Sequence, residues 1–342
     1  MASLHLIPDS SFVLFLAPPA WGKTRMIEEL WREGERGIIF ISPLRALALE
    51  VHERFKKSKE VFYLEGQGEW RDVQKKFDKA SKPFLIATPE CLHGEFYDYL
   101  ESLEKRPLIV IDEFHLFYLW GETFRPHLFE SLMGFALSKA PILGLSATMA
   151  PELIQRWKFE FSLSMDHLFL IDLGNQTLLK PPRFKHFYFS FFPEMFRRRF
   201  IYELLHNQKE TFLYFCSRRS EVDQWLDFCA RRGISALGCK GGEVQSFIES
   251  LKKCPEPQVI FSTSALSHGV NLPPLSKVFI GEALGRKDFW LQMAGRGGRK
   301  GEQYELFSFD EFEESLKNKT KRFLKEFFFD FKVKWKLLIN FE

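Results

Sequence analysis

Cysteine is scarce in this sequence and is not arranged for binding a metal. The five cysteines stand at positions 91, 216, 229, 239 and 254, so no two of them form a Cys-x-x-Cys pair and their number is odd. A zinc site and a disulfide framework are therefore both disfavoured. We expect a protein of the reducing cytoplasm.

Long apolar runs and a strong net charge are absent too. No run approaches the roughly 20 residues of a membrane-spanning helix, and the N-terminus lacks the basic-then-apolar order of a signal peptide. We therefore expect no membrane partner. The net charge of +3 neither establishes nor excludes a nucleic-acid partner, because a local basic groove matters more than the sum.

The sequence is rich in hydrophobic residues that can form large cores. Hydrophobic residues make up 45% of the 342 positions and charged residues 27%, which suits a chain of two ordinary domains. Phenylalanine occurs 39 times. We interpret this excess as core filling in preference to an aromatic binding surface.

Residues 108–115 carry the first chemical signal. Four apolar residues read as a strand buried on both faces, and Asp112, Glu113 and His115 follow at its end. An Asp at a strand end can hold the Mg²⁺ of a bound nucleotide, and a neighbouring Glu can polarise the attacking water. Taken alone, the same pattern is equally typical of a solvated loop start.

A phosphate-binding loop is the second signal. Residues 11–16 predict a strand and residues 26–32 a helix, and Ala20, Trp21, Gly22, Lys23 and Thr24 lie between them. Backbone N–H groups and the helix N-terminus can hold phosphates there, while Lys23 reaches the β and γ groups and the Thr24 hydroxyl binds Mg²⁺. A chance Gly-Lys-Thr turn is the alternative, and the placement after a buried strand favours the functional interpretation.

Further apolar runs alternate with helical segments in both halves. In the first half the additional strands are predicted at residues 37–41, 61–64, 84–87, 141–148 and 168–173. The second half starts a new alternation with strands at 211–216 and 259–263, without a second Gly-Lys-Thr. This order predicts α/β domains with parallel sheets, whose polar strand ends share one edge.

Eight short motifs, spread over residues 17–299, resemble in sequence and order those of superfamily 2 DExH-box helicases. The first half has Ala-Pro-x-x-x-Gly-Lys-Thr, Pro-Leu-Arg-Ala-Leu-Ala, Thr-Pro-Glu, Asp-Glu-x-His and Ser-Ala-Thr. The second half has a looser motif at residues 212–219, then Gly-Val-Asn-Leu-Pro and Gln-Met-x-Gly-Arg-x-Gly-Arg. The second motif and the Arg125-Pro126 stretch are most similar to the Ski-like branch, which includes archaeal repair helicases and exosome-associated RNA helicases.

The resemblance implies a two-domain motor core. It predicts two RecA-like parallel-sheet domains in tandem, at residues 1–178 and 179–310, followed by an amphipathic helical extension at 311–342. It implies an ATP-dependent helicase or translocase that uses ATP and Mg²⁺ and grips single-stranded or partly duplex DNA or RNA by its backbone.

The resemblance also assigns roles, residue by residue. The implied catalytic residues are Glu113, which activates water, and Gln292, Arg296 and Arg299, with one arginine acting as a finger on the γ-phosphate. The implied nucleotide contacts are Ala20, Trp21, Gly22, Lys23, Thr24, Asp112, His115 and Gly269, of which Thr24 and Asp112 support Mg²⁺ and His115 links the site toward the second domain. The implied nucleic-acid contacts are Arg45, Thr88, Pro89, Ser217, Arg218 and Thr263. Ser146 and Thr148 are implied to couple the two sites.

Two alternatives stay open. The family usually has Thr-Gly where this chain has Pro19-Ala20, and an Ala held at positive φ costs on the order of 1 kcal/mol, so a slow or inactive helicase-like scaffold is one alternative. A P-loop ATPase that remodels a protein complex is the other. The intact motifs at residues 43–48 and 88–90 argue against the second, since the resemblance implies that they face a strand.

The last segment, 311–342, carries apolar residues at helical spacing: Phe312, Leu316, Phe323, Phe327, Phe331 and Trp335. We interpret it as an amphipathic helix packed back onto the motor, in preference to an arm that docks a protein partner. Its basic residues, Lys317, Lys319, Lys321, Arg322 and Lys325, indicate a solvated helix face more than an extended nucleic-acid track.

Overall fold

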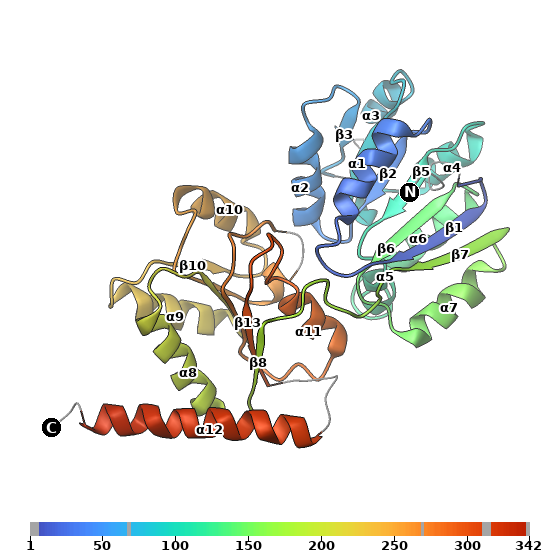
Figure 1. Cartoon of the computed structure of the whole chain (residues 1–342). Helices are drawn as coiled ribbons and strands as arrows, with labels where there is room; N and C mark the ends of the chain where they lie inside the picture. Colours follow the sequence, from blue (N-terminus) through green and yellow to red (C-terminus); the bar gives the residue numbers. More distant parts are fainter. Residues whose placement is uncertain (1–6, 67–69, 268–269, 310–315, 340–342) are drawn as a thin grey trace. The chain divides into compact units, whose positions relative to one another are not determined.

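The computed structural model describes residues 7–66, 70–267, 270–309 and 316–339, and the side chains of the last helix from 318 to 332. The chain divides into two compact units, Met1–Thr177 and Leu178–Glu342 (Figure 1). Each unit is built on one parallel β-sheet. The predicted fold class, tandem α/β domains with parallel sheets, is confirmed.

The first unit has a seven-stranded sheet in which every pair of neighbours is parallel. From one edge to the other its strands are β3 (Val61–Tyr63), β4 (Phe84–Ala87), β2 (Ile38–Ile41), β5 (Leu108–Ile111), β6 (Ile142–Ser146), β1 (Ser11–Leu16) and β7 (His167–Asp172). The strands β2, β5, β6 and β1 are buried along their whole length. Their continuous apolar runs are what a parallel sheet covered on both faces requires.

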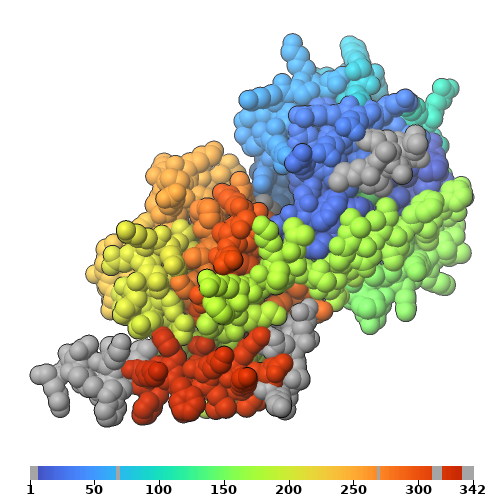
Figure 2. Space-filling view, in the orientation of Figure 1, coloured from blue at the N-terminus to red at the C-terminus, as the bar shows by residue number. Residues whose placement is uncertain are grey.

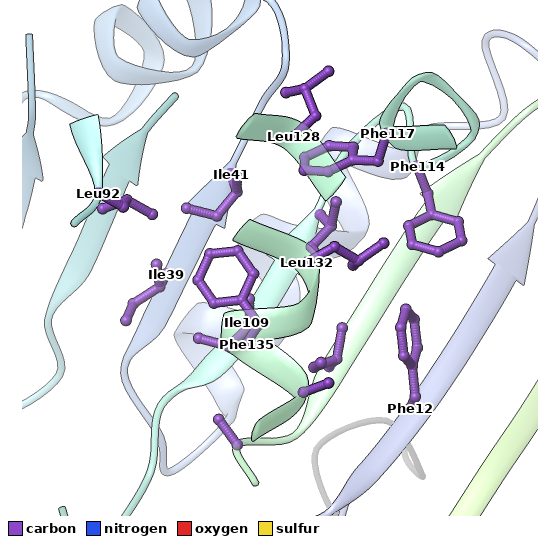
Figure 3. Close-up of a cluster of buried hydrophobic side chains, with 14 of the residues drawn as sticks. Phe12, Ile39, Ile41, Leu92, Ile109, Phe114, Phe117, Leu128, Leu132 and Phe135 are labelled. Atoms are coloured by element: carbon purple, nitrogen blue, oxygen red, sulfur yellow. The ribbon is translucent and has the colours of Figure 1, made fainter. Parts of the chain in front are cut away.

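Helices cover both faces of that sheet. They are α1 (Lys23–Glu33), α2 (Arg45–Phe55), α3 (Trp70–Phe77), η2 (Pro89–Cys91), α4 (Gly94–Ser102), α5 (His115–Leu119), α6 (His127–Leu137) and α7 (Pro151–Phe161). On one face, strand side chains meet the apolar side of α6, as Figure 3 shows for Phe12, Ile39, Ile41, Ile109, Leu128, Leu132 and Phe135. On the other face, alternate strand residues such as Val13 and Phe40 pack against Met26 of α1 and Val51 of α2.

The second unit has a six-stranded parallel sheet. Its strands, in spatial order, are β10 (Ala236–Cys239), β11 (Val259–Ser262), β9 (Phe212–Phe215), β12 (Lys277–Ile280), β13 (Glu305–Ser308) and β8 (Phe184–Phe187). The helical elements are α8 (Pro193–His206), α9 (Arg219–Ala230), α10 (Val244–Lys253), η3 (Ser264–Leu266), α11 (Lys287–Ala294) and α12 (Leu316–Ile339). Two apolar clusters, one on each face, again enclose the central strands.

Four strands of the second sheet lie outside the segments predicted as strands: β8, β10, β12 and β13. β8 pairs with β13 at one edge, and β10 pairs with β11 at the other. Both edge strands are short and only partly buried, so neither shows the continuous apolar run that identifies a central strand. β13 is buried, but it follows a glycine-rich segment and has no turn signal of its own.

The helix α12 contacts both β8 and α8, so it packs back onto its unit as predicted. The predicted packing face is only partly right, because Phe323 packs against the core of the unit whereas Phe327 and Phe331 do not. Phe327 and Phe331 are 46% and 61% exposed. The side chains of Phe312, Leu316 and Trp335 lie outside the described residues. Charged side chains on another side of the helix hold it as well, as shown below.

Candidate nucleotide and strand site

The phosphate loop joins β1 to α1 at the carboxyl end of the first sheet. Gly22 caps α1 through its backbone at φ 103°, and Ala20 stands at φ 65°. The positive φ that was predicted to strain an alanine is therefore present at position 20. Trp21 packs its ring 5.1 Å from that of Phe15 and so anchors the loop to the core. The N-terminal turn of α1 lies at this loop, and the N-terminus of a helix is the kind of place that binds an anion.

Lys23 lies at the first position of α1, and its ammonium group is held by the loop itself. Its Nζ donates to the carbonyl oxygens of Ala17 at 3.2 Å and Pro18 at 3.5 Å. This places a positive charge beside the end of β1. Thr24 follows in the same first turn and is partly buried.

Asp112 and Glu113 follow β5, the central strand of the same sheet. The Asp112 carboxylate accepts a hydrogen bond from the Glu113 N–H at 3.0 Å. Burial and the nearby charge of Glu113 raise the pKa of Asp112 to about 7, against the opposing effect of Lys23. Two carboxylates that are short of positive charge form a donor set suited to Mg²⁺, with the Thr24 hydroxyl as a further oxygen donor.

Glu113 has an unusual backbone and an unsatisfied side chain. Its φ is 46°, in the left-handed region that non-glycine residues seldom adopt. Among the residues that the structure describes, Oε2 is buried without a hydrogen-bond partner, and its nearest cation-forming neighbour is His115 Nδ1 at 3.6 Å. A buried carboxylate oxygen with spare acceptor capacity suits the binding of a water molecule.

A hydrogen-bonded relay starts at His115, beside this carboxylate, and leads to the Ser-Ala-Thr motif. His115 is 1% exposed, and its Nδ1 lies 2.9 Å from Ser146 Oγ. Ser146 Oγ in turn accepts from the Thr148 N–H at 3.2 Å. His115 therefore faces Ser146 within the first unit, and its expected link to the second unit stays a prediction.

The strand-facing candidates of the first unit lie on the loops beyond β2 and β4. Arg45 begins α2 and is exposed, and its positive charge opposes the burial that raises the pKa of the Tyr63 phenol. Thr88 caps η2, with its hydroxyl 3.4 Å from Cys91 Sγ, and Pro89 is buried beside it. They follow neighbouring strands of one sheet, so the topology brings them to the same edge.

Arg125 is a residue to which the sequence analysis assigned no role. Its Nη1 donates to the carbonyl oxygen of Pro43 at 2.6 Å and its Nε to Glu90 Oε1 at 2.9 Å. One guanidinium thus joins the loop after β2 to the loop after β4, and the fork geometry of arginine suits such a bridge. The only sequence signal was the Arg-Pro pair itself, which was noted for its resemblance and not for a contact.

In the second unit, the Gln-Met-Ala-Gly-Arg segment runs from α11 into a tight turn. Arg296 is 1% exposed and donates from Nη1 to the Val270 carbonyl oxygen at 2.9 Å. Arg299 is half-buried, with its Nε donating to Gly295 at 3.0 Å, and Gln292 is buried. Gly269 lies outside the described residues. Arg296 therefore joins this motif to the Gly-Val-Asn-Leu-Pro motif.

The remaining candidates, Ser217, Arg218 and Thr263, follow β9 and β11, which are neighbours in the sheet. Ser217 donates to Glu221 from both N–H and hydroxyl, at 3.0 and 3.1 Å. Arg218 is exposed at the N-cap of α9, and Thr263 is half-exposed at the N-cap of η3. The structure thus brings the candidates of each unit to one sheet edge.

Across the described part of the chain, no helix is both long and apolar enough to span a membrane. Nor do three or more His, Cys, Asp or Glu residues of that part form a cluster that could hold a metal ion by themselves. A Mg²⁺ ion at Thr24 and Asp112 is consistent with this, because Mg²⁺ keeps several water and phosphate oxygens as ligands.

Among curated proteins the chain is similar to DNA helicases. It is 24% identical over 284 residues to a RecQ-like DNA helicase BLM of Xenopus laevis, which covers 77% of the chain and 20% of that protein. It is 25% identical over 272 residues to an ATP-dependent DNA helicase RecQ of Pasteurella multocida, at 76% and 41% coverage. An ATP-dependent DNA helicase Hel308 of Methanococcus vannielii is 31% identical over 164 residues, at 44% and 21% coverage. The chain spans between a fifth and two fifths of these relatives' lengths.

Among solved structures the fold matches Mss116p bound to single-stranded RNA and AMP-PNP, with a TM-score of 0.65 at 16% identity over 89% of this chain and 66% of that chain. It also matches Saccharomyces cerevisiae Dbp5 bound to RNA and ADP BeF3, with a TM-score of 0.62 at 16% identity, covering 94% and 85%. The DEAD/DEAH box helicase family matches residues 2–156, and the helicase conserved C-terminal domain matches residues 197–301. The chain therefore carries the N-terminal and C-terminal domains of the DEAD/DEAH box helicases and belongs to superfamily 2.

Proposed function

We propose that this chain is an ATP-dependent nucleic-acid helicase or translocase of the DExH type. The observation that carries the proposal is the relay from His115 to Ser146 and Thr148, which starts beside the Glu113 carboxylate. Such a relay places the Ser-Ala-Thr motif next to the carboxylate that is proposed to activate water, an arrangement that a simple nucleotide-binding protein does not need. The supporting similarity extends over most of the chain.

In this proposal, the residues of the first unit have separate roles in binding the nucleotide and in hydrolysis. The phosphate loop and Lys23 bind the phosphates, and Thr24 and Asp112 would hold a Mg²⁺ ion, which would neutralise charge on the transferring group. Glu113 Oε2 orients the attacking water, because it is a buried acceptor without another partner among the described residues. Gln292, Arg296 and Arg299 of the second unit are assigned to the nucleotide by the resemblance, with Arg299 the less buried arginine.

We assign the grip on the strand to Arg45, Thr88 and Pro89 in the first unit and to Ser217, Arg218 and Thr263 in the second. Exposed arginines and backbone groups at loop tips contact phosphates and carry no sequence readout. DNA and RNA are both admitted, as single strands or partial duplexes. Membership of the Ski-like branch is the finer part of this proposal, supported by the Pro-Leu-Arg-Ala-Leu-Ala motif and by the similarity to Hel308.

The test is an ATPase assay with single-stranded DNA, with single-stranded RNA and with neither. We expect at least one polymer to raise kcat of the wild-type protein and Lys23→Ala to abolish turnover. The matched control is Lys76→Ala, which removes an exposed lysine of α3 and should leave the rate unchanged. A rate that no polymer alters contradicts the motor and favours an ATPase acting on a protein complex.

A further inference from the structure

The helix α12 is attached to the second unit through charged side chains. Glu326 and Asp330 are 6% and 8% exposed. Glu326 accepts from His186 Nδ1 at 2.7 Å and from the Tyr188 hydroxyl, and the Arg198 guanidinium grips Asp330 with two bonds at 2.7 and 3.0 Å. Buried carboxylates with complete partner sets fix the helix in one register.

The opposite side of α12 is apolar and exposed. Leu324, Phe327, Phe328 and Phe331 are 47%, 46%, 62% and 61% exposed. Their spacing of three, four and seven residues places them in one stripe along the helix. In Figure 2 the described part of α12, drawn in red, lies at the surface of the second unit.

The stripe continues onto the loop between β8 and α8. Phe191 and Phe192 of that loop are 67% and 41% exposed, and the Phe192 ring stacks on Phe323 of α12 at 5.6 Å. We call the six exposed residues the α12 patch: Phe191, Phe192, Leu324, Phe327, Phe328 and Phe331. The interpretation of the phenylalanines as core filling is therefore wrong for this surface. A contiguous group of exposed aromatic rings marks an interaction site.

Along α12, the charge beside the patch is positive. Lys321, Lys325 and Lys332 are exposed and lie along one border of the stripe, since they stand three or four residues from its members. The acidic residues of the described part of α12, Glu326 and Asp330, are both turned inward. Across residues 318–332 the outer side of the helix thus offers aromatic rings edged by positive charge.

We propose that the α12 patch docks an amphipathic helix with an acidic flank, supplied by a protein partner. Residues at i, i+3/i+4 and i+7 form the seam that a second helix fills, and lysines beside such a seam pair with glutamates or aspartates across it. A second copy of α12 brings lysines against lysines, which disfavours self-association. The ion pairs beneath the helix hold the seam preformed, so binding does not have to order it. This inference does not rest on the ATPase.

The experiment measures the binding of synthetic peptides to the full chain by fluorescence anisotropy. The probe is a labelled helix of about three heptads with leucine at the seam positions and glutamate beside them, and its twin carries lysine in place of glutamate. We expect the acidic peptide to bind and the basic one not to bind. Phe328→Ser with Phe331→Ser should weaken binding at least about tenfold, since aromatic anchors dominate such interfaces.

Charge reversal gives the sharper test. Lys321→Glu with Lys325→Glu should lose the acidic peptide and gain the basic one, a reversal that loss of folding does not produce. The matched control is Leu163→Ser, which removes an 84% exposed leucine from the first unit and should bind as wild type does. Retained ATPase and an unchanged melting temperature show that each variant is folded.

Four results overturn the proposal. They are failure of the wild-type chain to bind the acidic peptide, equal binding of both peptides, displacement of the peptide by phosphatidylserine vesicles or single-stranded oligonucleotide at the patch, and a dimer in sedimentation that Phe328→Ser dissolves. The last three assign the patch to nonspecific apolar contact, to an anionic bilayer or strand, or to a second copy. A change in ATPase alone leaves the peptide result standing, so failure of the motor and failure of the patch are distinguishable.

Discussion

The two units share a scaffold and use buried carboxylates in opposite ways. Asp112, at the end of a central strand in the first unit, has a raised pKa because it is buried beside Glu113. Glu326, on the helix of the second unit, is also buried, yet bonds from His186 and the charges of His186 and Arg199 outweigh that burial and lower its pKa. Near Asp112 the charge of Lys23 is too weak to offset burial and the charge of Glu113, whereas Glu326 has partners that do offset its burial.

The difference separates a ligand site from a structural attachment. A carboxylate with a raised pKa gains stability when a cation arrives, so Asp112 is poised for a metal. Glu326 already has three protein donors, so a ligand has nothing to add. Both sheets are parallel and covered on both faces, which means that the contrast arises in loops and attached helices and not in the scaffold.

The largest expected effect tests the ligand side of this comparison. Glu113→Gln keeps the size of the side chain and removes the charge that activates water, so strand-stimulated kcat should fall by about 10²–10⁴. Nucleotide affinity, measured with a fluorescent ATP analogue, should change little. The control Glu101→Gln, at an exposed position of α4, should match the wild type. Equal rates for Glu113→Gln and wild type establish the inactive scaffold instead.

The second-largest effect is expected when the relay from His115 to Thr148 is interrupted. Ser146→Ala removes the hydroxyl between His115 and Thr148 and leaves a buried imidazole nitrogen without that partner. We expect stimulation by a strand to drop by about tenfold and stability by about 1–3 kcal/mol. The control Ser138→Ala removes another fully buried hydroxyl, bonded to Phe135, and should cost stability alone. If both variants keep full strand stimulation, Ser146 is only structural.

The third prediction concerns the buried carboxylate that attaches α12 to the second unit. Glu326→Ala leaves His186, Tyr188 and Arg199 buried without their carboxylate and should cost about 3 kcal/mol in urea unfolding. Lys325→Ala, one residue away and exposed, is the matched control. A cost no larger than that of the control shows that the buried pairs do not hold the helix.

The same attachment should depend on pH. Burial lowers the pKa of His186, but hydrogen bonds to Glu305 and Glu326 outweigh it and raise the pKa overall, while Arg199 opposes them. The pKa of Glu305 and of Glu326 is lowered. The His186 contribution is therefore complete below about pH 6.5 and is lost as pH rises through its raised pKa, whereas the carboxylate contributions are present above about pH 4.5 and are lost on acidification.

The melting temperature lost in His186→Gln should thus be largest near pH 5–6 and shrink by pH 9. Glu305 on β13, Glu326 on α12 and Arg199 on α8 are the charged groups that face the imidazole. His206→Gln, at the exposed end of α8, supplies the comparison. A loss that stays constant from pH 5 to pH 9 excludes an imidazolium in the attachment.

Local sequence was enough for the central strands and for the residues at their ends. Asp112 and Lys23 follow continuous apolar runs, so alternation and position together placed them at one sheet edge. The bridge made by Arg125 was beyond such an argument, because its partners lie 82 and 35 residues away in the chain. The φ of Glu113 was likewise set by tertiary structure and not by any residue preference.

The face of α12 shows the same limit more plainly. Helical spacing identified an apolar stripe, and we predicted that it faces the core because the apolar side of a surface helix usually does. What decides the orientation is the chance to satisfy Glu326 and Asp330 with His186 and Arg198, residues that lie more than 130 positions earlier. A periodic pattern indicates that a helix has an apolar and a polar side, but it does not determine which side packs against the domain.

The smallest expected effect concerns the strain in the phosphate loop. Ala20→Gly should relieve about 1 kcal/mol of left-handed strain, because glycine has no Cβ to clash at φ 65°. Glycine also loosens the unfolded chain by about 0.4–1 kcal/mol, so the net change in unfolding free energy should lie near zero. Ala230, at the end of α9, does not have a positive φ. Ala230→Gly therefore has only the effect on the unfolded chain and should be destabilised.

The changes in unfolding free energy of Ala20→Gly and Ala230→Gly should therefore differ by the strain energy at position 20. The difference between the urea midpoints of the two variants measures it. A loop released from that strain rearranges around phosphate more easily, so Ala20→Gly should raise kcat a few-fold, while Ala230→Gly should not alter it. Equal destabilisation of both variants means that position 20 stores no strain. Strain at Ala20 with an unchanged kcat means that the strain affects stability and does not limit turnover.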